Sequence, residues 1–196
     1  GGRVAHRLAV DLPARVRKLS VLDIAPTLDM YKRTDMDFAR AYYHWFHLIQ
    51  PSPLPEKMIG GNVLHYLHAK LGGWGSAGTS FIEPEAMAEY ERSLTLPPEQ
   101  AGDLMPAVHT ACEDYRASAS IDLVHDQESR DQGHKIKCDL LVLWGERGVV
   151  HKMFKPLALW QAQCEGQVSG QVVASGHFIP EELPESTSDA LAKWMV

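Results

Sequence analysis

Two short apolar runs, far apart in the sequence, limit the folds open to this chain more than any other feature. Residues 19–24 read Leu-Ser-Val-Leu-Asp-Ile, and residues 139–144 read Asp-Leu-Leu-Val-Leu-Trp. Runs of this length that are apolar almost throughout are typical of strands buried in a parallel sheet. A third strand is expected at 171–174, and amphipathic spacing predicts a helix at 187–196. The pattern therefore predicts a mostly parallel α/β sheet.

The long stretch between the first two predicted strands has helical spacing instead. We expect Thr34 to cap a helix there, with Asp37 at the capping-box position and an apolar face formed by Phe38, Tyr42, Trp45 and Ile49. Further helices are expected at about 58–71, 85–94 and 107–121, with Pro97-Pro98 between the last two, and again at 155–163. The predicted organisation is a core at 1–26 and 128–196 with a helical cap at 27–127 inserted between strands.

The composition excludes several classes of protein. The chain has 196 residues, of which 45% are hydrophobic and 22% charged, as in ordinary globular proteins. A net charge of −6 without a basic cluster argues against nucleic-acid binding. No apolar run reaches the roughly 18–20 residues that span a bilayer. The three cysteines have no C-x-x-C spacing, so we expect reduced thiols in a cytoplasmic protein.

His177 is the sharpest candidate for chemistry. It lies in Ser-Gly-His-Phe, between a predicted strand and a predicted helix, where catalytic groups of α/β sheets gather. A histidine there acts as a general base if a carboxylate orients it. Asp23, at the end of the first strand, and Glu146, in Trp-Gly-Glu-Arg-Gly, are the competing carboxylates. The plainer interpretations are a surface histidine and a turn-forming aspartate.

A group of aromatic donors forms the second candidate. His44 and Trp45 lie within Tyr-Tyr-His-Trp-Phe-His at 42–47, and Tyr115 lies in a later helix. Several N–H and O–H groups that converge could bind an anion, whereas the plainer interpretation is a cap helix packed by its aromatic face. The histidine pairs and the spacing of His109 and Glu113 complete no known metal motif, so neither a metal nor another cofactor is expected.

Taken together, these motifs resemble the haloacetate (fluoroacetate) dehalogenases of the α/β-hydrolase superfamily. The resemblance covers essentially the whole chain and rests on segments that occur in the family's order: Gly-Gly-Arg-Val-Ala-His-Arg at 1–7, Val-Leu-Asp-Ile-Ala-Pro at 21–26, Tyr-His-Trp-Phe at 43–46, Cys-Glu-Asp-Tyr-Arg-Ala at 112–117 and Ser-Gly-His-Phe at 175–178. It implies part of an α/β-hydrolase fold with a helical cap.

The resemblance also implies a role for each matching residue. Arg3 matches the second arginine of the family's His-Asp-Arg-Gly-x-Arg nucleophile elbow, which holds the substrate carboxylate. Asp23 matches the triad acid and His177 the triad base. The halide-binding donors of the cap are matched by His44, Trp45 and Tyr115.

The implied reaction needs a residue that the chain is not expected to contain. The family's nucleophilic aspartate, and the arginine after it, would occupy the two positions before Gly1. We therefore expect the chain to be the C-terminal portion of a longer enzyme and to be inactive alone. The implied substrate is a small 2-halo acid, which the enzyme converts into a 2-hydroxy acid and halide. Neither nucleic acid nor a membrane is expected as a partner, and a homodimer is left open.

Two alternatives stay open on the sequence. An epoxide hydrolase of the same fold also uses an aspartate nucleophile, but it needs a pair of cap tyrosines, of which Tyr115 could be one. The second alternative is a truncated, non-catalytic α/β-hydrolase module that works by binding. Assays with haloacetate and with an aryl epoxide distinguish the epoxide hydrolase from a dehalogenase. The complete reading frame tests the non-catalytic module, because it shows whether residues precede Gly1.

Overall fold

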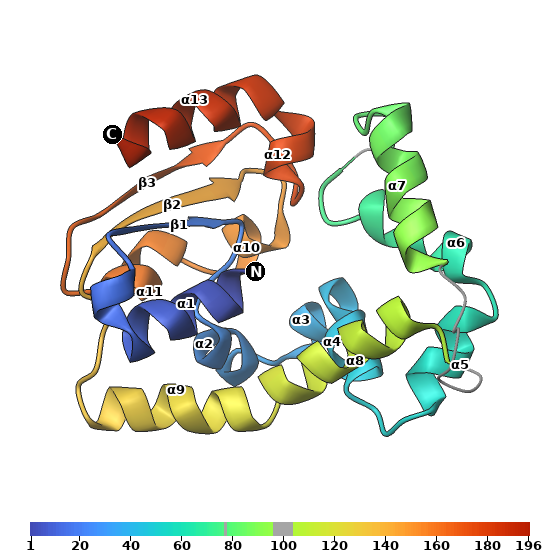
Figure 1. The fold of residues 1–196 in the computed structure, drawn as a ribbon, viewed down its shortest axis with the longest axis horizontal. Coiled ribbons are helices and arrows are strands. Elements are labelled where there is room, and N and C mark those ends of the chain that lie inside the picture. Colours follow the sequence, from blue (N-terminus) through green and yellow to red (C-terminus); the bar gives the residue numbers. More distant parts are fainter. Residues whose placement is uncertain (77, 96–103) are drawn as a thin grey trace. The chain divides into compact units, whose positions relative to one another are not determined.

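The chain folds as two compact units. The computed structural model describes residues 1–76, 78–95 and 104–196 (Figure 1). One unit, here the sheet unit, comprises residues 1–34, 74–76 and 123–196, and the other, the helical unit, comprises residues 35–73 and the described part of 77–122. Residues 27–34 and 123–127, assigned to the cap in the sequence-based ranges, have most of their contacts within the sheet unit.

The sheet unit contains three parallel strands in the order β1-β2-β3: Lys18–Leu22, Asp139–Gly145 and Val168–Val173. This confirms the predicted parallel α/β sheet. The third strand begins at Val168, three residues earlier than predicted. The prediction missed this start because Ser169-Gly170 is typical of a loop. A Cβ atom on Gly170 would lie 2.0 Å from the Val142 carbonyl oxygen, so glycine lets the two strands approach there.

Helices cover both faces of this sheet (Figure 1). On one face, α1 and α11 contribute Ala9 and Trp160 to a buried cluster that includes Leu140 and Val142 of the central strand. On the opposite face lies α13, whose Trp194 carbonyl oxygen accepts a hydrogen bond of 2.8 Å from Lys18 Nζ. The helices of the sheet unit are α1 (Gly2–Asp11), the 3-10 turn η1 (Pro13–Arg15), α2 (Thr27–Lys32), α9 (Ile121–Asp131), α10 (Val149–Met153), α11 (Pro156–Ala162), α12 (Ile179–Glu182) and α13 (Pro184–Met195).

The first predicted cap helix is divided in two, and its predicted cap is wrong. Asp35, not Thr34, caps α3, because the extended backbone at Asp35 lets its carboxylate accept a 2.8 Å hydrogen bond from the Phe38 N–H. Thr34 instead donates its hydroxyl to the Tyr31 carbonyl oxygen. The chain leaves helical geometry at Tyr42, whose ring stacks on Trp45 at a centroid distance of 5.7 Å.

The other predicted cap helices also differ at their ends. The helix expected at 58–71 forms two helices, and the one expected at 107–121 ends at Ser118, three residues before α9 begins. Pro97-Pro98 lies outside the described residues. The helices of the helical unit are α3 (Met36–Ala41), α4 (Tyr43–Leu48), α5 (Leu54–Gly60), α6 (Val63–Leu71), α7 (Pro84–Leu94) and α8 (Pro106–Ser118). Within the described part of the chain, none of the helices has the length and apolar character needed to cross a membrane.

Candidate active site

Asp23 is held at the carboxyl end of β1 by contacts with β2. Its backbone N–H donates to the Leu143 carbonyl oxygen at 2.7 Å, and its side-chain Oδ1 accepts from the Gly145 N–H at 3.0 Å. The residue has a φ of +48°, a left-handed conformation that aspartate tolerates better than most residues do. With 2% of its surface exposed, the carboxylate is buried, and these contacts aim its second oxygen away from the strand.

The second oxygen of Asp23 meets the candidate histidine. His177 Nδ1 lies 2.6 Å from Asp23 Oδ2, across 154 residues of sequence, and the histidine side chain is 30% exposed. When the carboxylate is ionised, Nδ1 donates to it and Nε2 is left with a free lone pair. This is the arrangement of a histidine that can accept a proton from water or from a substrate.

The structure brings Asp23, rather than Glu146, to the histidine. Glu146 follows β2 and is exposed, and among the described residues no hydrogen bond joins its carboxylate to His177. The glycines on either side of it have a clear role instead. A Cβ on Gly145 would lie 2.0 Å from the Gly176 carbonyl oxygen, and one on Gly148 would lie 3.2 Å from both Asp23 oxygens. The absence of a side chain at Gly145 therefore leaves room for the histidine loop, and its absence at Gly148 leaves room for the Asp23 carboxylate.

Trp74 lies beside the same histidine, and the sequence did not single it out. Its ring makes an edge-on contact with the His177 ring, at a centroid distance of 5.1 Å and an interplanar angle of 81°. The segment Trp74–Ser76 comes from the middle of the predicted cap, yet it packs with the sheet unit. A local signal existed in Gly-Gly-Trp-Gly at 72–75, since Trp74 and Gly75 both have positive φ and only glycine fits next to the Arg147 carbonyl group.

The proposed halide donors lie in the helical unit, two of them in direct contact. His44 Nε2 and the Tyr115 hydroxyl are 3.2 Å apart, and the rings of Trp45 and Tyr115 have centroids 6.0 Å apart. His44 and Trp45 are 3% and 5% exposed, so both are buried on α4 against α8. The structure thus gathers the three side chains that the sequence grouped, and their convergence on one anion stays a prediction.

Arg3 lies in the first turn of α1 and is half-buried. That turn lies against Ile24, the residue after Asp23. A Cβ on Gly2 would lie 3.0 Å from the Ile24 side chain. The predicted role of Arg3 in binding a carboxylate stays a prediction.

One group in the helical unit has the donor types of a metal site. Ligand atoms of Glu56, His109 and Glu113 lie within 4.8 Å of one another. Arg116 already lies among them, however, and donates to Glu56 Oε1 at 2.9 Å and to Glu113. Burial opposes ionisation of Glu56, but the hydrogen bonds from Arg116 and His109 outweigh it and lower the pKa of Glu56 to about 2. The cluster therefore serves as an ion-pair network that ties α5 to α8.

The comparisons with known proteins agree with the resemblance drawn from the motifs. The chain is 35% identical to a fluoroacetate dehalogenase from Burkholderia sp over 195 residues, which covers 100% of this chain and 60% of the relative. A structure from Nostoc sp PCC 7120, named an alpha/beta hydrolase, is 48% identical with a TM-score of 0.88 and is covered to 63%. The scan against family models found no match.

A second solved structure is named an epoxide hydrolase. This mutant protein from Pseudomonas aeruginosa, solved with bound MFA, is 36% identical with a TM-score of 0.87; the match covers 100% of this chain and 62% of that one. The chain thus spans about 60% of the length of the relatives it matches. The comparisons confirm both the resemblance and the fold: the chain forms part of an α/β-hydrolase fold.

Proposed function

We propose that this chain belongs to an enzyme that removes halide from a small 2-halo carboxylate. The proposal starts from the partial α/β-hydrolase fold and from the resemblance to fluoroacetate dehalogenase. The observation that carries the proposal is the 2.6 Å contact between His177 Nδ1 and Asp23 Oδ2. An acid and a base that meet at the carboxyl ends of parallel strands have the placement of a hydrolytic site.

In this proposal the reaction has two steps. An aspartate attacks the carbon that bears the halogen, the carbon–halogen bond breaks with its electron pair on the halide, and an aspartyl ester forms. Water then attacks the carbonyl carbon of the ester while His177 Nε2 accepts its proton. The proton passes to the departing oxygen, and the 2-hydroxy acid leaves. The net reaction consumes one water and releases one halide and one proton.

Asp23 serves the second step in two ways. Its carboxylate fixes the tautomer that leaves Nε2 free, and it stabilises the imidazolium that forms when His177 takes the proton. Because Asp23 is 2% exposed, that interaction is weakly screened by water. The partial exposure of His177, at 30%, leaves the base accessible to a water molecule.

The cap donors and Arg3 account for the halo acid. Fluoride is a poor leaving group in apolar surroundings, so donors aimed at it stabilise charge as the bond breaks. The contact of 3.2 Å between His44 and Tyr115 supports a shared binding point. Loss of one such donor is expected to raise the barrier by about 2.7–4 kcal/mol. Arg3 offers a planar fork that suits a carboxylate better than an uncharged alkyl halide does.

Epoxide hydrolysis is the second candidate, and one observation favours it. The Pseudomonas aeruginosa structure that is 36% identical carries that name. An epoxide hydrolase protonates the ring oxygen from acidic hydroxyl groups of the cap. Tyr115 could supply one proton, but its hydroxyl faces His44 at 3.2 Å, which suits a group of donors around an anion.

The deciding assay uses the complete reading frame that encodes this chain. Fluoride release from fluoroacetate and chloride release from chloroacetate are measured beside diol formation from styrene oxide. Halide release without diol supports dehalogenation, diol without halide supports the alternative, and neither product overturns both.

A pair of histidine variants assigns the base. In His177→Gln the first step proceeds and the ester is not hydrolysed, so one equivalent of halide is released and the adduct is seen by intact mass. His134→Gln, at an exposed histidine after α9, is the matched control and is expected to turn over normally. Full turnover by His177→Gln would remove His177 from the mechanism.

A further inference from the structure

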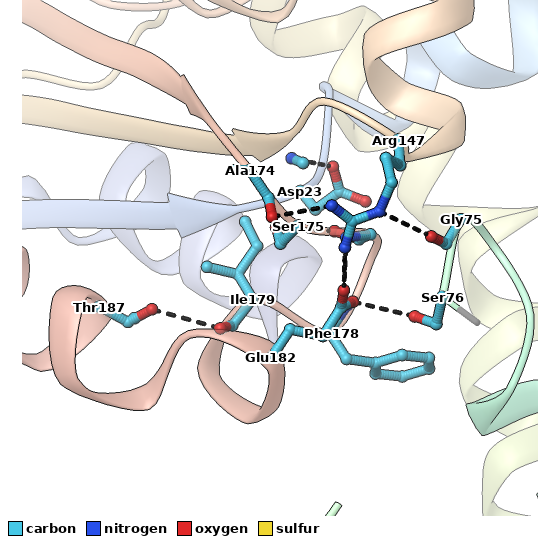
Figure 2. Close-up of polar contacts among 12 residues, drawn as sticks. Asp23, Gly75, Ser76, Arg147, Ala174, Ser175, Phe178, Ile179, Glu182 and Thr187 are labelled. Atoms are coloured by element: carbon cyan, nitrogen blue, oxygen red, sulfur yellow. Dashed lines mark hydrogen bonds and ion pairs between the residues drawn. The ribbon is translucent and has the colours of Figure 1, made fainter. Parts of the chain in front are cut away.

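A buried carboxylate next to the histidine loop has a set of contacts that the proposed reaction does not use. Glu182 is the last residue of α12 and lies beside the loop that follows β3 (Figure 2). Its side chain is 7% exposed. Its Oε2 accepts from the Gly176 N–H at 2.7 Å, and its Oε1 accepts from the Phe178 N–H at 3.3 Å. The two backbone groups that it binds are those immediately before and after His177.

Arg147 completes this arrangement from the other side. Its Nη2 donates to Glu182 Oε2 at 2.8 Å, and its Nη1 donates to the Ala174 carbonyl oxygen at 2.9 Å. Arg147 Nε also reaches the Gly75 carbonyl oxygen at 3.2 Å, while the Ser76 hydroxyl donates to Glu182 Oε1 at 2.9 Å. Figure 2 shows the guanidinium and the carboxylate between the segment Gly75–Ser76 and the loop that follows β3.

The chemistry of this site favours a carboxylate over any other side chain. All four groups around the Glu182 oxygens are donors: two backbone N–H groups, a hydroxyl and a guanidinium. A buried charge is costly unless it is paired and hydrogen-bonded, and here both conditions are met. The loop is also too tight to shift freely, because a Cβ on Gly176 would lie 2.8 Å from Glu182 Oε1 and from the Gly75 carbonyl carbon.

We propose that Glu182 is a positioning residue for His177 and that Arg147 is its counter-ion. By fixing the backbone on both sides of His177, the carboxylate sets where the imidazole meets Asp23. Through Ser76 and Arg147 the same pair holds the Trp74–Ser76 segment against the histidine loop, so the Trp74 ring stays 5.1 Å from the His177 ring. The kinetic part of this inference rests on the proposed function, whereas the structural part does not.

Glu182→Gln tests the inference with little change of shape. The amide keeps one acceptor oxygen but turns an NH₂ group toward neighbours of which only the Ser76 hydroxyl can accept a hydrogen bond, so the loop loses part of its anchorage. We expect kcat for halide release to fall about 10- to 100-fold, as for small misplacements of catalytic groups, with KM changed by no more than about twofold. Glu185→Gln, which removes an exposed charge three residues later, is the control and is expected to behave as the wild type.

A second readout is independent of catalysis. The proton between His177 Nδ1 and Asp23 Oδ2 is expected as a resolved low-field NMR signal, because short charge-assisted hydrogen bonds strongly deshield their proton. This signal should broaden or disappear in Glu182→Gln and persist in Glu185→Gln. If the wild type releases no halide, the proposed function fails, and the NMR signal still decides whether Glu182 positions the histidine.

Arg147→Met keeps the test decisive if Glu182→Gln unfolds. This variant leaves the loop N–H groups bound to Glu182 but removes the counter-ion, so the same changes are expected at smaller amplitude. A folded Glu182→Gln or Arg147→Met protein with the wild-type kcat and the wild-type low-field signal would overturn the inference. A variant in which kcat falls and KM rises together, while the low-field signal stays intact, would also overturn the inference. That result would indicate a general effect on the fold.

Discussion

At the scale of single residues, the left-handed backbone of Asp23 places its carboxylate for contact with His177. A φ of +48° turns the chain out of β1 and lets the carboxylate receive the Gly145 N–H and face His177 together. Few side chains tolerate this conformation, and asparagine and aspartate are foremost among them. The local backbone therefore restricts the residue types that can stand at this point before any catalytic requirement is considered.

This restriction makes Asp23→Asn an informative change. Asparagine suits the same backbone and can still accept the Gly145 N–H, so the melting temperature should change little. Without the negative charge, His177 loses its orienting partner, and kcat for halide release should fall by about 10⁴-fold, the loss seen when serine proteases lose the equivalent charge. Near-normal kcat in a folded Asp23→Asn protein would contradict the assignment of Asp23 as the acid.

Gly145→Ala tests the close approach of the two loops. The new Cβ would lie 2.0 Å from the Gly176 carbonyl oxygen, so the histidine loop has to move. We expect a loss of about 1–3 kcal/mol in the free energy of unfolding, as for overpacked sites, together with reduced activity. Gly61→Ala is the control, because its Cβ would meet only ordinary contacts of 3.6 Å or more; urea denaturation of both variants should show a change in Gly145→Ala alone.

Local sequence was enough to propose His177 and its two candidate acids, because a strand end followed by a polar residue is a local pattern. It could not choose between Asp23 and Glu146, since that depends on which strand end lies beside the loop. Glu182 was not predicted at all. Its role depends on contacts with Arg147 and Ser76, which are 35 and 106 residues away in the sequence.

At the scale of elements, the strands and the helical character of the cap were predicted, but several boundaries were not. Apolar periodicity continues through Tyr42, yet α3 ends at Ala41 and the backbone of Tyr42, with a φ of −117° and a ψ of 38°, is not helical. Likewise Ser169-Gly170 reads as a loop but forms part of β3, since the adjacent strand supplies the hydrogen bonds. In β3, strand pairing overrides local propensity.

The link between α5 and α8 depends on the ionised carboxylate of Glu56. Hydrogen bonds from Arg116 and His109 outweigh burial and lower its pKa from the ordinary 4.5 to about 2. A carboxyl group whose pKa is lower in the folded state stabilises the fold above its unfolded pKa and loses that contribution as the pH falls. The stability of the helical unit that depends on Glu56 should therefore be complete above about pH 5 and decline toward pH 2.

Glu56→Gln should remove this dependence. At pH 7 the variant leaves Arg116 without its buried partner, and we expect a loss of about 3 kcal/mol in the free energy of unfolding. Between pH 5 and pH 2 the difference between variant and wild type should narrow, as the wild-type carboxylate takes up a proton. Glu85→Gln, at an exposed position in α7, serves as the control. A difference that stays constant with pH in guanidinium titrations would contradict the role of the Glu56 charge.

At the scale of the whole molecule, the two units are built from different kinds of contact. The sheet unit joins distant parts of the chain, as in the pairing of Asp23 with His177 across 154 residues and of Arg7 with Asp126 across 119. The helical unit has no strand among its described residues, and its three shortest helices, α3, α4 and α5, have six, six and seven residues. Helices this short are unstable alone in water, so they depend on packing against one another.

The cysteines give each unit its own reporter. Cys112 is buried in the helical unit, where burial raises the pKa of its thiol to about 11, and Cys164 is buried in the sheet unit, where burial also raises the thiol pKa. Both thiols should therefore react slowly at pH 8 while their unit is folded, because the thiolate is the reactive form. Cys138 lies in the sheet unit too, and its carbonyl oxygen accepts from Cys164 Sγ at 3.3 Å.

Because the helical unit depends on the packing of short helices, we expect it to open at a lower denaturant concentration than the sheet unit does. Pulsed alkylation across a guanidinium series, followed by mass spectrometry of the cysteine peptides, measures the two midpoints in one sample. Cys112 should become reactive first, and Cys138 should share its midpoint with Cys164. A single midpoint for Cys112 and Cys164 would show instead that the two units unfold as one cooperative body, and an earlier Cys164 would reverse the order of stability argued from the short helices.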